Sequence, residues 1–239
     1  MKASGELKLS GTRSEGADYS GQRFKYISVA NGSHLTKCDF RRIRATQGCL
    51  GGGRRPSVYT ECVFDGSTLK GDGLDPGRAT FIKCSFLDTS LIRLDFRDAE
   101  FVDCVFSGRI ESVIFSAKPY AEDAELGRTR NRYEGNDFSA ARMKDVAFRG
   151  GIDLGLQRFP DSDDYFILRD AAGPLEIAMR DAERWGEAED RDEAIATIET
   201  LEFNVKGGQR DLFIHTEFLT GGLSPEAAER LMSIFREHS

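Results

Sequence analysis

The sequence offers few side chains whose type and spacing could carry out catalysis. The histidines His34, His215 and His238 are far apart in the chain, and none belongs to an HExxH pattern, so they do not predict a metal-dependent hydrolase. No GxSxG, Walker A or GxGxxG pattern occurs, which argues against a hydrolase nucleophile elbow and a nucleotide-binding loop. Because His215 lies in an apolar run, we interpret it as a structural residue.

Two further segments resemble functional motifs only superficially. Residues 51–55 are rich in glycine and arginine but lack the Gly-Lys-Ser/Thr element of a phosphate loop. Asp163 and Asp164 are adjacent carboxylates in a polar segment, where aspartate is common because it stabilises turns. We therefore predict no catalytic, cofactor-binding or metal-ligating residue, and the balance favours a protein that is not an enzyme.

The five cysteines are the other side chains with potential reactivity. Four of them lie in Cys-x-Phe units at intervals of 24, 22 and 20 residues: Cys38, Cys62, Cys84 and Cys104. Structural zinc sites use short ligand spacings such as CxxC, and this chain contains no CxxC. We expect reduced thiols that fill the core. Cys49 lies outside the series and is expected to be the most exposed thiol.

The cysteines belong to a longer pattern with a period of five residues. Between residues 79 and 108, six consecutive pentads have a large apolar residue at the centre: Phe81, Phe86, Leu91, Phe96, Phe101 and Phe106. Two residues before each centre the side chain is small or apolar: Ala79, Cys84, Thr89, Leu94, Ala99 and Cys104. A period of five matches neither a helix, at 3.6 residues, nor a strand, at two.

This pattern resembles the pentapeptide-repeat family over about residues 20–159. The resemblance implies a mainly β fold, a right-handed quadrilateral β-helix in which each pentad forms one side and four pentads complete a turn. The central residue and the small residue two before it then point inward. The four Cys-x-Phe units would stack in one column that continues at Asn136. Spacings longer than 20 residues mark insertions, which we place at 51–57 and 118–132, and about six coils are expected, some of them incomplete.

Charge divides the chain into two parts. Its 239 residues have a net charge of -7. Residues 1–160 contain 25 Lys and Arg against 21 Asp and Glu, whereas residues 161–239 contain 8 against 19. These counts give net charges of +4 and -11 and predict a domain boundary near Pro160. No apolar run reaches the length of a membrane span, and the first residues lack the apolar core of a signal peptide, so we expect a cytoplasmic protein.

Residues 161–239 change period and predict a small acidic α+β domain, appended to the β-helix or capping it. The segments are a strand at Tyr165–Leu168, a helix opened by Gly173 and Pro174, and a second helix from near Asp190 to Gly207. A strand-like run at Leu212–Leu219 and a last helix after Ser224 and Pro225 follow.

The resemblance implies a rigid, non-catalytic rod that binds other proteins. Well-known members of the family modulate or protect DNA gyrase by imitating duplex DNA with an acidic surface, but the β-helix of this chain is net positive. We therefore place first a non-catalytic protein-binding scaffold, for example an immunity or self-resistance factor. A DNA-mimic modulator of gyrase or topoisomerase is the second hypothesis. An enzyme with a site between the β-helix and the C-terminal domain is the third.

Recognition is expected in the insertions, because loops on rigid scaffolds commonly bind partners. The candidate partner-binding residues are Arg54, Arg55, Tyr120, Glu122, Asp123, Arg128 and Arg130. We expect a protein partner, and a homodimer is possible under this hypothesis. Direct binding of nucleic acid is disfavoured, because no aromatic residues alternate with the basic cluster of Arg41, Arg42, Arg44, Arg54 and Arg55. No cofactor and no membrane partner are expected.

Overall fold

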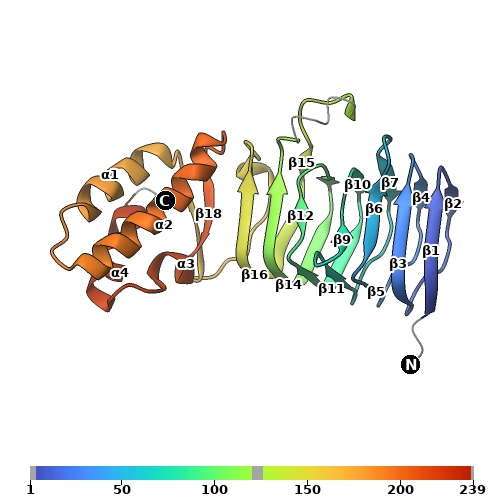
Figure 1. Cartoon of the computed structure of the whole chain (residues 1–239), viewed down its shortest axis with the longest axis horizontal. Coiled ribbons are helices and arrows are strands. Elements are labelled where there is room, and N and C mark those ends of the chain that lie inside the picture. Colours follow the sequence, from blue (N-terminus) through green and yellow to red (C-terminus); the bar gives the residue numbers. More distant parts are fainter. Residues whose placement is uncertain (1–3, 120–125, 238–239) are drawn as a thin grey trace. The chain divides into compact units, whose positions relative to one another are not determined.

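A computed structural model describes residues 4–119 and 126–237 of the chain. The chain divides into two compact units, residues 1–147 with 155–160 and residues 148–154 with 161–239. The first unit consists of strands, and the second is mainly helical (Figure 1). No helix in the described ranges combines the length and the apolar character that a membrane crossing requires.

The first unit is a parallel β-solenoid of about five turns, where about six coils were predicted. Its strands are stacked side by side from β1 to β16 in two sheets (Figure 1). The larger sheet contains β1 (Ser4–Ser10), β3 (Arg23–Ala30), β5 (Arg44–Ala45), β6 (Gly48–Gly52), β8 (Thr68–Lys70), β9 (Leu74–Asp75), β11 (Ser85–Ile92), β12 (Asp95–Phe96), β14 (Val105–Ser116) and β16 (Asp137–Arg149). The smaller sheet contains β2 (Arg13–Glu15), β4 (His34–Thr36), β7 (Ser57–Thr60), β10 (Ala79–Ile82), β13 (Glu100–Val102) and β15 (Tyr133–Glu134).

The period of five residues arises because each pentad forms one side of a coil. Residues one coil apart are backbone partners, so Tyr59 pairs with Phe81 and Phe81 with Phe101. The pentad centres and the small residues two positions before them are buried, as predicted. The β-solenoid implied by the resemblance to pentapeptide-repeat proteins is confirmed.

Stacked aromatic rings fill the interior of the solenoid. One ladder contains Tyr19, Phe40, Phe64, Phe86, Phe106, Phe138 and Phe159. The centroids of successive rings are 4.9, 4.8, 4.9, 5.0, 4.5 and 5.9 Å apart. A second ladder of Tyr59, Phe81 and Phe101 meets the first edge to face, a favourable geometry for aromatic rings. The predicted stacking of Phe64, Phe86 and Phe106 is confirmed.

The four cysteines of the Cys-x-Phe units form the predicted inward column. Their thiols are buried and free, and each lies near a backbone carbonyl of the preceding coil. For example, Sγ of Cys62 lies 3.3 Å from the carbonyl oxygen of Leu35, and Sγ of Cys104 lies 3.5 Å from that of Phe81. Asn136 continues the column: its Oδ1 accepts a hydrogen bond from the backbone N–H of Cys104 at 3.0 Å.

One corner of the solenoid places charged residues in the left-handed backbone region. Lys37, Glu61, Lys83 and Asp103 have φ angles of 51°, 54°, 53° and 54°. This conformation is unfavourable for residues with a Cβ atom. Each backbone N–H nevertheless bonds to the next coil, at 2.8 Å for Lys37 and 2.9 Å for Glu61. The corner therefore accepts either sign of charge at equivalent positions.

The second unit has its own core around α1 (Ala172–Ala182), α2 (Ala188–Lys206), α3 (Thr216–Thr220), α4 (Pro225–Arg236) and the antiparallel pair β17 (Tyr165–Leu168) and β18 (Leu212–His215). The prediction of a strand-like run to Leu219 is wrong beyond His215. Nδ1 of His215 accepts the backbone N–H of Glu217 at 3.1 Å and caps a short helix there. Ser224 caps α4 as predicted.

Candidate binding site

The first insertion is shorter than predicted. Gly51 and Gly52 belong to β6, so the loop comprises Gly53–Pro56. A Cβ atom on Gly51 would lie 2.3 Å from the backbone nitrogen of Ala79, which means that only glycine fits against the neighbouring coil. The run of glycines therefore reflects close backbone packing in part, and the predicted start of the insertion at residue 51 is wrong.

Arg54 and Arg55 are exposed at the tip of this loop. The backbone of the loop is held from both sides. Nη1 of Arg78 donates to the carbonyl oxygens of Gly53 and Arg54, at 3.2 and 3.1 Å. The backbone N–H of Gly32 donates to the carbonyl oxygen of Arg55 at 3.1 Å. Two basic side chains are thus presented from a fixed backbone.

The second insertion is only partly described. Tyr120, Glu122 and Asp123 lie outside the described residues. Arg130 is exposed, whereas Arg128 is largely covered and makes internal contacts. Nε of Arg128 donates to Oδ1 of Asn131 at 2.9 Å, and its Nη2 donates to the carbonyl oxygen of Asp98. These contacts give Arg128 a structural role at the base of the insertion.

A buried carboxylate anchors the base of this insertion. Glu100 is 5% exposed. Its Oε2 accepts from the Thr80 hydroxyl at 3.0 Å and lies 3.2 Å from Nη1 of Arg128, while its Oε1 accepts the backbone N–H of Arg132 at 3.0 Å. Burial acts to raise the pKa of Glu100, but hydrogen bonds from Arg132 and the charge of Arg128 outweigh it, so the pKa lies below its usual value. Glu100 is therefore a carboxylate in the folded protein.

Asn131 ties the same segment to the end of β14 and to the residue that follows β12. Its side chain is 1% exposed, and Nδ2 donates to the carbonyl oxygens of Arg97 at 2.7 Å and Ser116 at 2.8 Å. A buried polar side chain stabilises a fold only when its hydrogen bonds are made. The C-terminal end of the insertion is thus fixed on the solenoid by a satisfied polar network.

Cys49 is the least buried of the five thiols, but it is still half-buried. Burial raises its pKa, and the nearby Asp75 carboxylate acts in the same direction. Burial also raises the pKa of Cys38 and Cys84. The cysteine column has the geometry of core filler.

We predict that Cys49 is the first thiol to react with iodoacetamide under native conditions. Its rate should be low near neutral pH and should rise with pH, because its raised pKa leaves little thiolate at pH 7. The cysteines of the column should stay protected. Native-state alkylation followed by peptide mass mapping measures the order of reaction, and modification of any column cysteine before Cys49 would contradict the prediction.

The predicted basic cluster does not lie on one side of the solenoid. Arg41 forms an ion pair with Asp39, its Nε lying 2.8 Å from Oδ2. Arg44 lies in β5, whereas Arg54 and Arg55 lie on the loop that follows β6. A different set of basic residues shares a side, and the sequence patterns did not identify it.

We call this set the basic face: Arg23, Lys25, Arg44, Lys70, Arg93, Arg109, Arg142 and Lys144. All of them lie in or directly beside β3, β5, β8, β11, β14 and β16, consecutive coils of the larger sheet. The register pairs Arg23 with Arg44, and Ser90 with Arg109. On β16, which pairs with β14, Arg142 and Lys144 flank the buried Met143.

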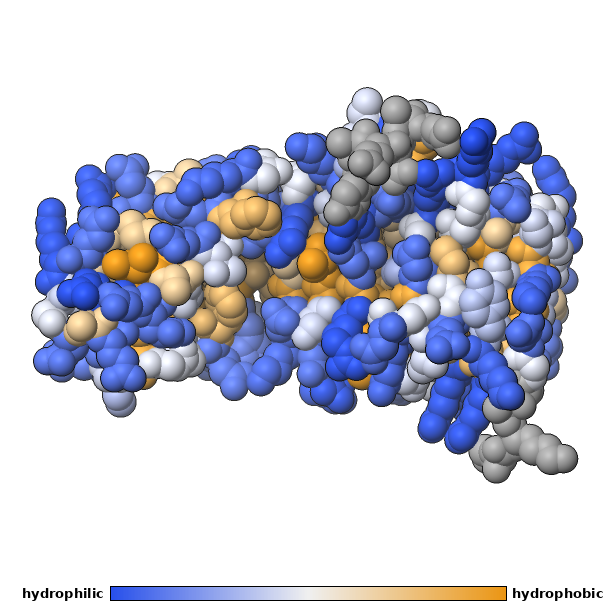
Figure 2. Space-filling model, viewed as in Figure 1, coloured by the Kyte–Doolittle hydropathy of each residue, from blue (hydrophilic) through white to orange (hydrophobic). Residues whose placement is uncertain are grey.

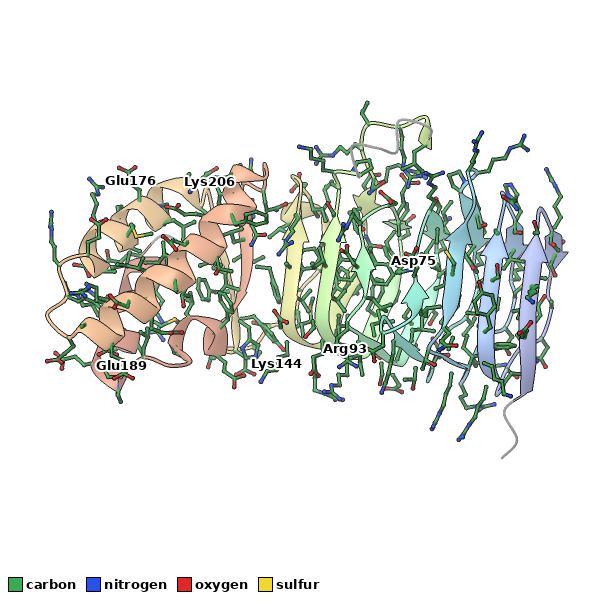
Figure 3. All side chains as sticks on the ribbon, viewed as in Figure 1. Asp75, Arg93, Lys144, Glu176, Glu189 and Lys206 are labelled. Atoms are coloured by element: carbon green, nitrogen blue, oxygen red, sulfur yellow. The ribbon has the colours of Figure 1, made fainter. Side chains whose placement is uncertain are left out.

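Part of this charge is unpaired. Arg93 bonds to the Asp72 carboxylate at 2.7 Å, and Arg109 forms an ion pair with Glu111. Within the described ranges, Arg44, Lys70 and Arg142 have no carboxylate at ion-pair distance. In Figure 2, hydrophilic side chains line the edges of the visible solenoid surface, and Arg93 and Lys144 project at the same edge in Figure 3. The basic face is an extended, solvent-exposed surface.

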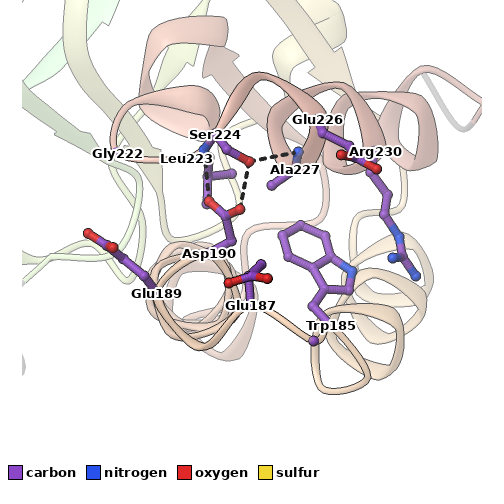
Figure 4. A pocket seen from close by; sticks show the side chains of 11 residues that line it. Trp185, Glu187, Glu189, Asp190, Gly222, Leu223, Ser224, Glu226, Ala227 and Arg230 are labelled. Atoms are coloured by element: carbon purple, nitrogen blue, oxygen red, sulfur yellow. Dashed lines mark hydrogen bonds between the residues drawn. The ribbon is translucent and has the colours of Figure 1, made fainter.

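The second unit contains a pocket of about 730 Å³ at the start of α2 and α4 (Figure 4). It is lined by Trp185, Gly186, Glu187, Glu189, Asp190, Gly222, Leu223, Ser224, Glu226, Ala227 and Arg230. Four of these side chains are acidic and one is basic. The Asp190 carboxylate accepts the backbone N–H and the hydroxyl of Ser224, at 2.7 and 2.6 Å, which lowers its pKa.

One wall of the pocket is an arginine stacked on a tryptophan ring. The guanidinium of Arg230 lies over the Trp185 ring, 5.3 Å from its centroid, and bonds to both oxygens of Asp181, at 2.7 and 2.6 Å. Asp181 also accepts the indole N–H of Trp185 at 3.0 Å. The Arg230 contact holds the pKa of Asp181 below its usual value. An aromatic ring beside carboxylates is a favourable environment for guanidinium and ammonium groups.

The histidines are not brought together. His34 is exposed on β4, His215 caps α3 through Nδ1, and His238 lies outside the described residues. Among the described residues, no group of three or more His, Cys, Asp or Glu side chains is arranged to hold a metal ion.

Comparisons with known proteins add little. No protein-family profile matches the sequence, and no curated protein sequence matches it. Two solved structures of trypsin-treated variants of QnrB1, described as a plasmid-mediated fluoroquinolone resistance protein, are similar to this chain. The first is 14% identical, covers 65% of this chain and 79% of that chain, and has a TM-score of 0.31. The second is 12% identical, covers 65% and 78%, and has a TM-score of 0.23.

Proposed function

We propose that the protein is a non-catalytic scaffold that binds a protein partner through the insertions of its solenoid. The supporting observation is that both insertions are fixed where they join the coils. Arg78 and Gly32 hold the backbone beside Arg54 and Arg55, and Glu100 holds the base of the second insertion. Fixed loops lose less conformational entropy on binding than mobile ones. Tyr120, Glu122, Asp123 and Arg130 remain candidates for the same role, whereas the guanidinium of Arg128 is engaged in internal contacts.

The finer hypothesis is an immunity or self-resistance factor that acts in a reducing cytoplasm, consistent with five free thiols. The DNA-mimic hypothesis is a second candidate. It requires an acidic solenoid surface, whereas the larger sheet of this solenoid carries the basic face. A gyrase supercoiling assay with and without the protein tests that candidate directly.

The experiment places a photo-crosslinking amino acid at Arg55 and, as a control, at the exposed Lys37 on another corner. We expect one discrete protein adduct from Arg55 and none from Lys37. With the purified partner, Arg54→Glu combined with Arg55→Glu should weaken binding at least about tenfold, or about 1.4 kcal/mol. The loop should keep its shape, because the hydrogen bonds from Arg78 and Gly32 are made to its backbone carbonyl oxygens. Unchanged affinity would show that the first insertion is not the binding site.

A further inference from the structure

We propose that two copies of the chain associate through oppositely charged surfaces, the basic face of one copy against the acidic pocket of the other. This goes beyond the scaffold role, because the occupant of the basic face is a second copy rather than the partner that the insertions bind.

The charge balance supports this pairing. The six pentads of the basic face, residues 22–26, 43–47, 67–71, 89–93, 108–112 and 141–145, contain eight basic and two acidic side chains, a net charge of +6. Residues 1–160 together have a net charge of only +4, and residues 161–239 have -11. The positive excess of residues 1–160 is thus concentrated on one side of the solenoid. Each copy that carries this basic face also carries the acidic second unit, so the two surfaces are always present in equal numbers. Complementary charge favours association and fixes orientation.

The acidic pocket can accept a basic side chain from the partner copy. Glu187, Glu189 and Glu226 are exposed at its rim. Within the described ranges, Glu187 and Glu189 form no ion pair. The contact of Arg230 with Trp185 and Asp181 shows that this wall already binds one guanidinium. Because Arg230 already fills that site, an arginine or lysine of the partner copy would meet the three rim carboxylates instead, and the pocket is large enough to admit such a side chain.

The composition of the basic face favours a protein over nucleic acid. Glu111 and Asp145 lie among its basic residues, and Asp72 pairs with Arg93 beside it. These carboxylates would repel a continuous line of phosphates, whereas an acidic protein surface with scattered arginines tolerates them.

Sedimentation velocity of the whole chain tests the proposal. At about 50 mM NaCl we expect a reversible, concentration-dependent dimer, and at about 500 mM the dissociation constant should rise at least about tenfold, because salt screens exposed charges. A chain that stays monomeric at low salt at all concentrations would overturn the proposal. Dimers that are indifferent to salt would also overturn it.

Charge-reversed variants identify the surfaces. The first variant carries Arg44→Glu and Arg142→Glu, and the second carries Glu187→Lys and Glu189→Lys. Each alone should weaken dimerisation at least about tenfold. An equimolar mixture of the two should recover a heterodimer, because the first keeps the wild-type pocket and the second keeps the wild-type basic face. A control with Lys37→Glu and Lys83→Glu changes the net charge as much as the first variant.

The control should dimerise like the wild type, since Glu61 already occupies an equivalent corner position. Thermal unfolding confirms that each variant is folded before it is compared. Failure of the mixture to recover the heterodimer, or equal weakening by the control, would show that the effect is one of overall charge and would overturn the assignment. If a variant no longer dimerises but still binds the protein partner through Arg54 and Arg55, the dimer proposal and the scaffold function are shown to be separate.

Discussion

Replacing Phe86 with alanine should lower the free energy of unfolding by about 3–5 kcal/mol, the usual range for truncating a buried aromatic ring. Phe86 is 2% exposed. It lies between Phe64 and Phe106 in the ladder, with centroids 4.9 and 5.0 Å away, and it meets Phe81 and Phe101 edge to face. The hole would be surrounded by rings stacked on fixed strands, which cannot collapse to fill it.

Thermal and urea unfolding of the whole chain measure this effect. The matched control is Leu87→Ala, the next residue in the same coil, whose side chain is 39% exposed. Its truncation should change the stability far less, because surface substitutions away from special features have small effects. Equal thermal midpoints for Phe86→Ala and the wild type would mean that the ladder is not part of the stabilising core.

The pentad pattern was sufficient to predict this ladder. A period of five with four sides per turn sets which residue points inward, so the stacking of Phe64, Phe86 and Phe106 followed from their spacing. The same rule placed Asn136 below Cys104 despite an interval of 32 residues. Because every coil repeats the same pattern, the inward positions of each coil can be assigned separately. A wrongly placed insertion in one coil therefore does not change the assignment of the next coil.

Features that depend on contacts between distant residues were not predictable. Glu100 and Arg128 meet although no local pattern links them, and a glycine run that resembled a loop proved to contain Gly51, which packs against the backbone of Ala79. In the second unit, the apolar run predicted a strand from Leu212 to Leu219, but the strand ends at His215, where a cap starts a short helix. Local hydrogen bonds outweighed the apolar pattern there.

The basic face escaped detection for a different reason. Its residues are spread over six pentads, between residues 23 and 144, and only the coil register brings them together. The outward positions carry no periodic signal, because the fold accepts any charge there. Assigning every fourth pentad to one side would have revealed the excess of arginine and lysine.

Glu100→Gln should lower the free energy of unfolding by about 3 kcal/mol at pH 7, the lower end of the range for breaking a buried ion pair. The amide keeps the shape of the side chain but removes the charge that faces Arg128, which is largely buried. We choose the lower end because Arg132, the other partner, is half exposed and can be hydrated.

The difference in the free energy of unfolding between wild type and Glu100→Gln should disappear in acid. The pKa of Glu100 is lowered in the folded protein from its ordinary value of 4.5. A carboxyl with a lowered native pKa stabilises the fold fully above its unfolded pKa, and that contribution is lost as the pH falls through the native pKa. The gap in stability between wild type and Glu100→Gln should therefore be full at pH 7. It should narrow below about pH 4.5 and close once Glu100 is protonated in both states.

Urea unfolding of both proteins across this pH range measures the gap rather than the absolute stability, so the other aspartates that titrate in acid cancel. The matched control is Glu134→Gln, an exposed carboxylate on the neighbouring strand β15, which should change stability little at any pH. A gap that stays constant down to pH 3, or one that Glu134→Gln reproduces, would mean that Glu100 does not act as a buried anion. The base of the second insertion would then be held by the hydrogen bonds of Asn131 and by that of Arg128 to Asp98.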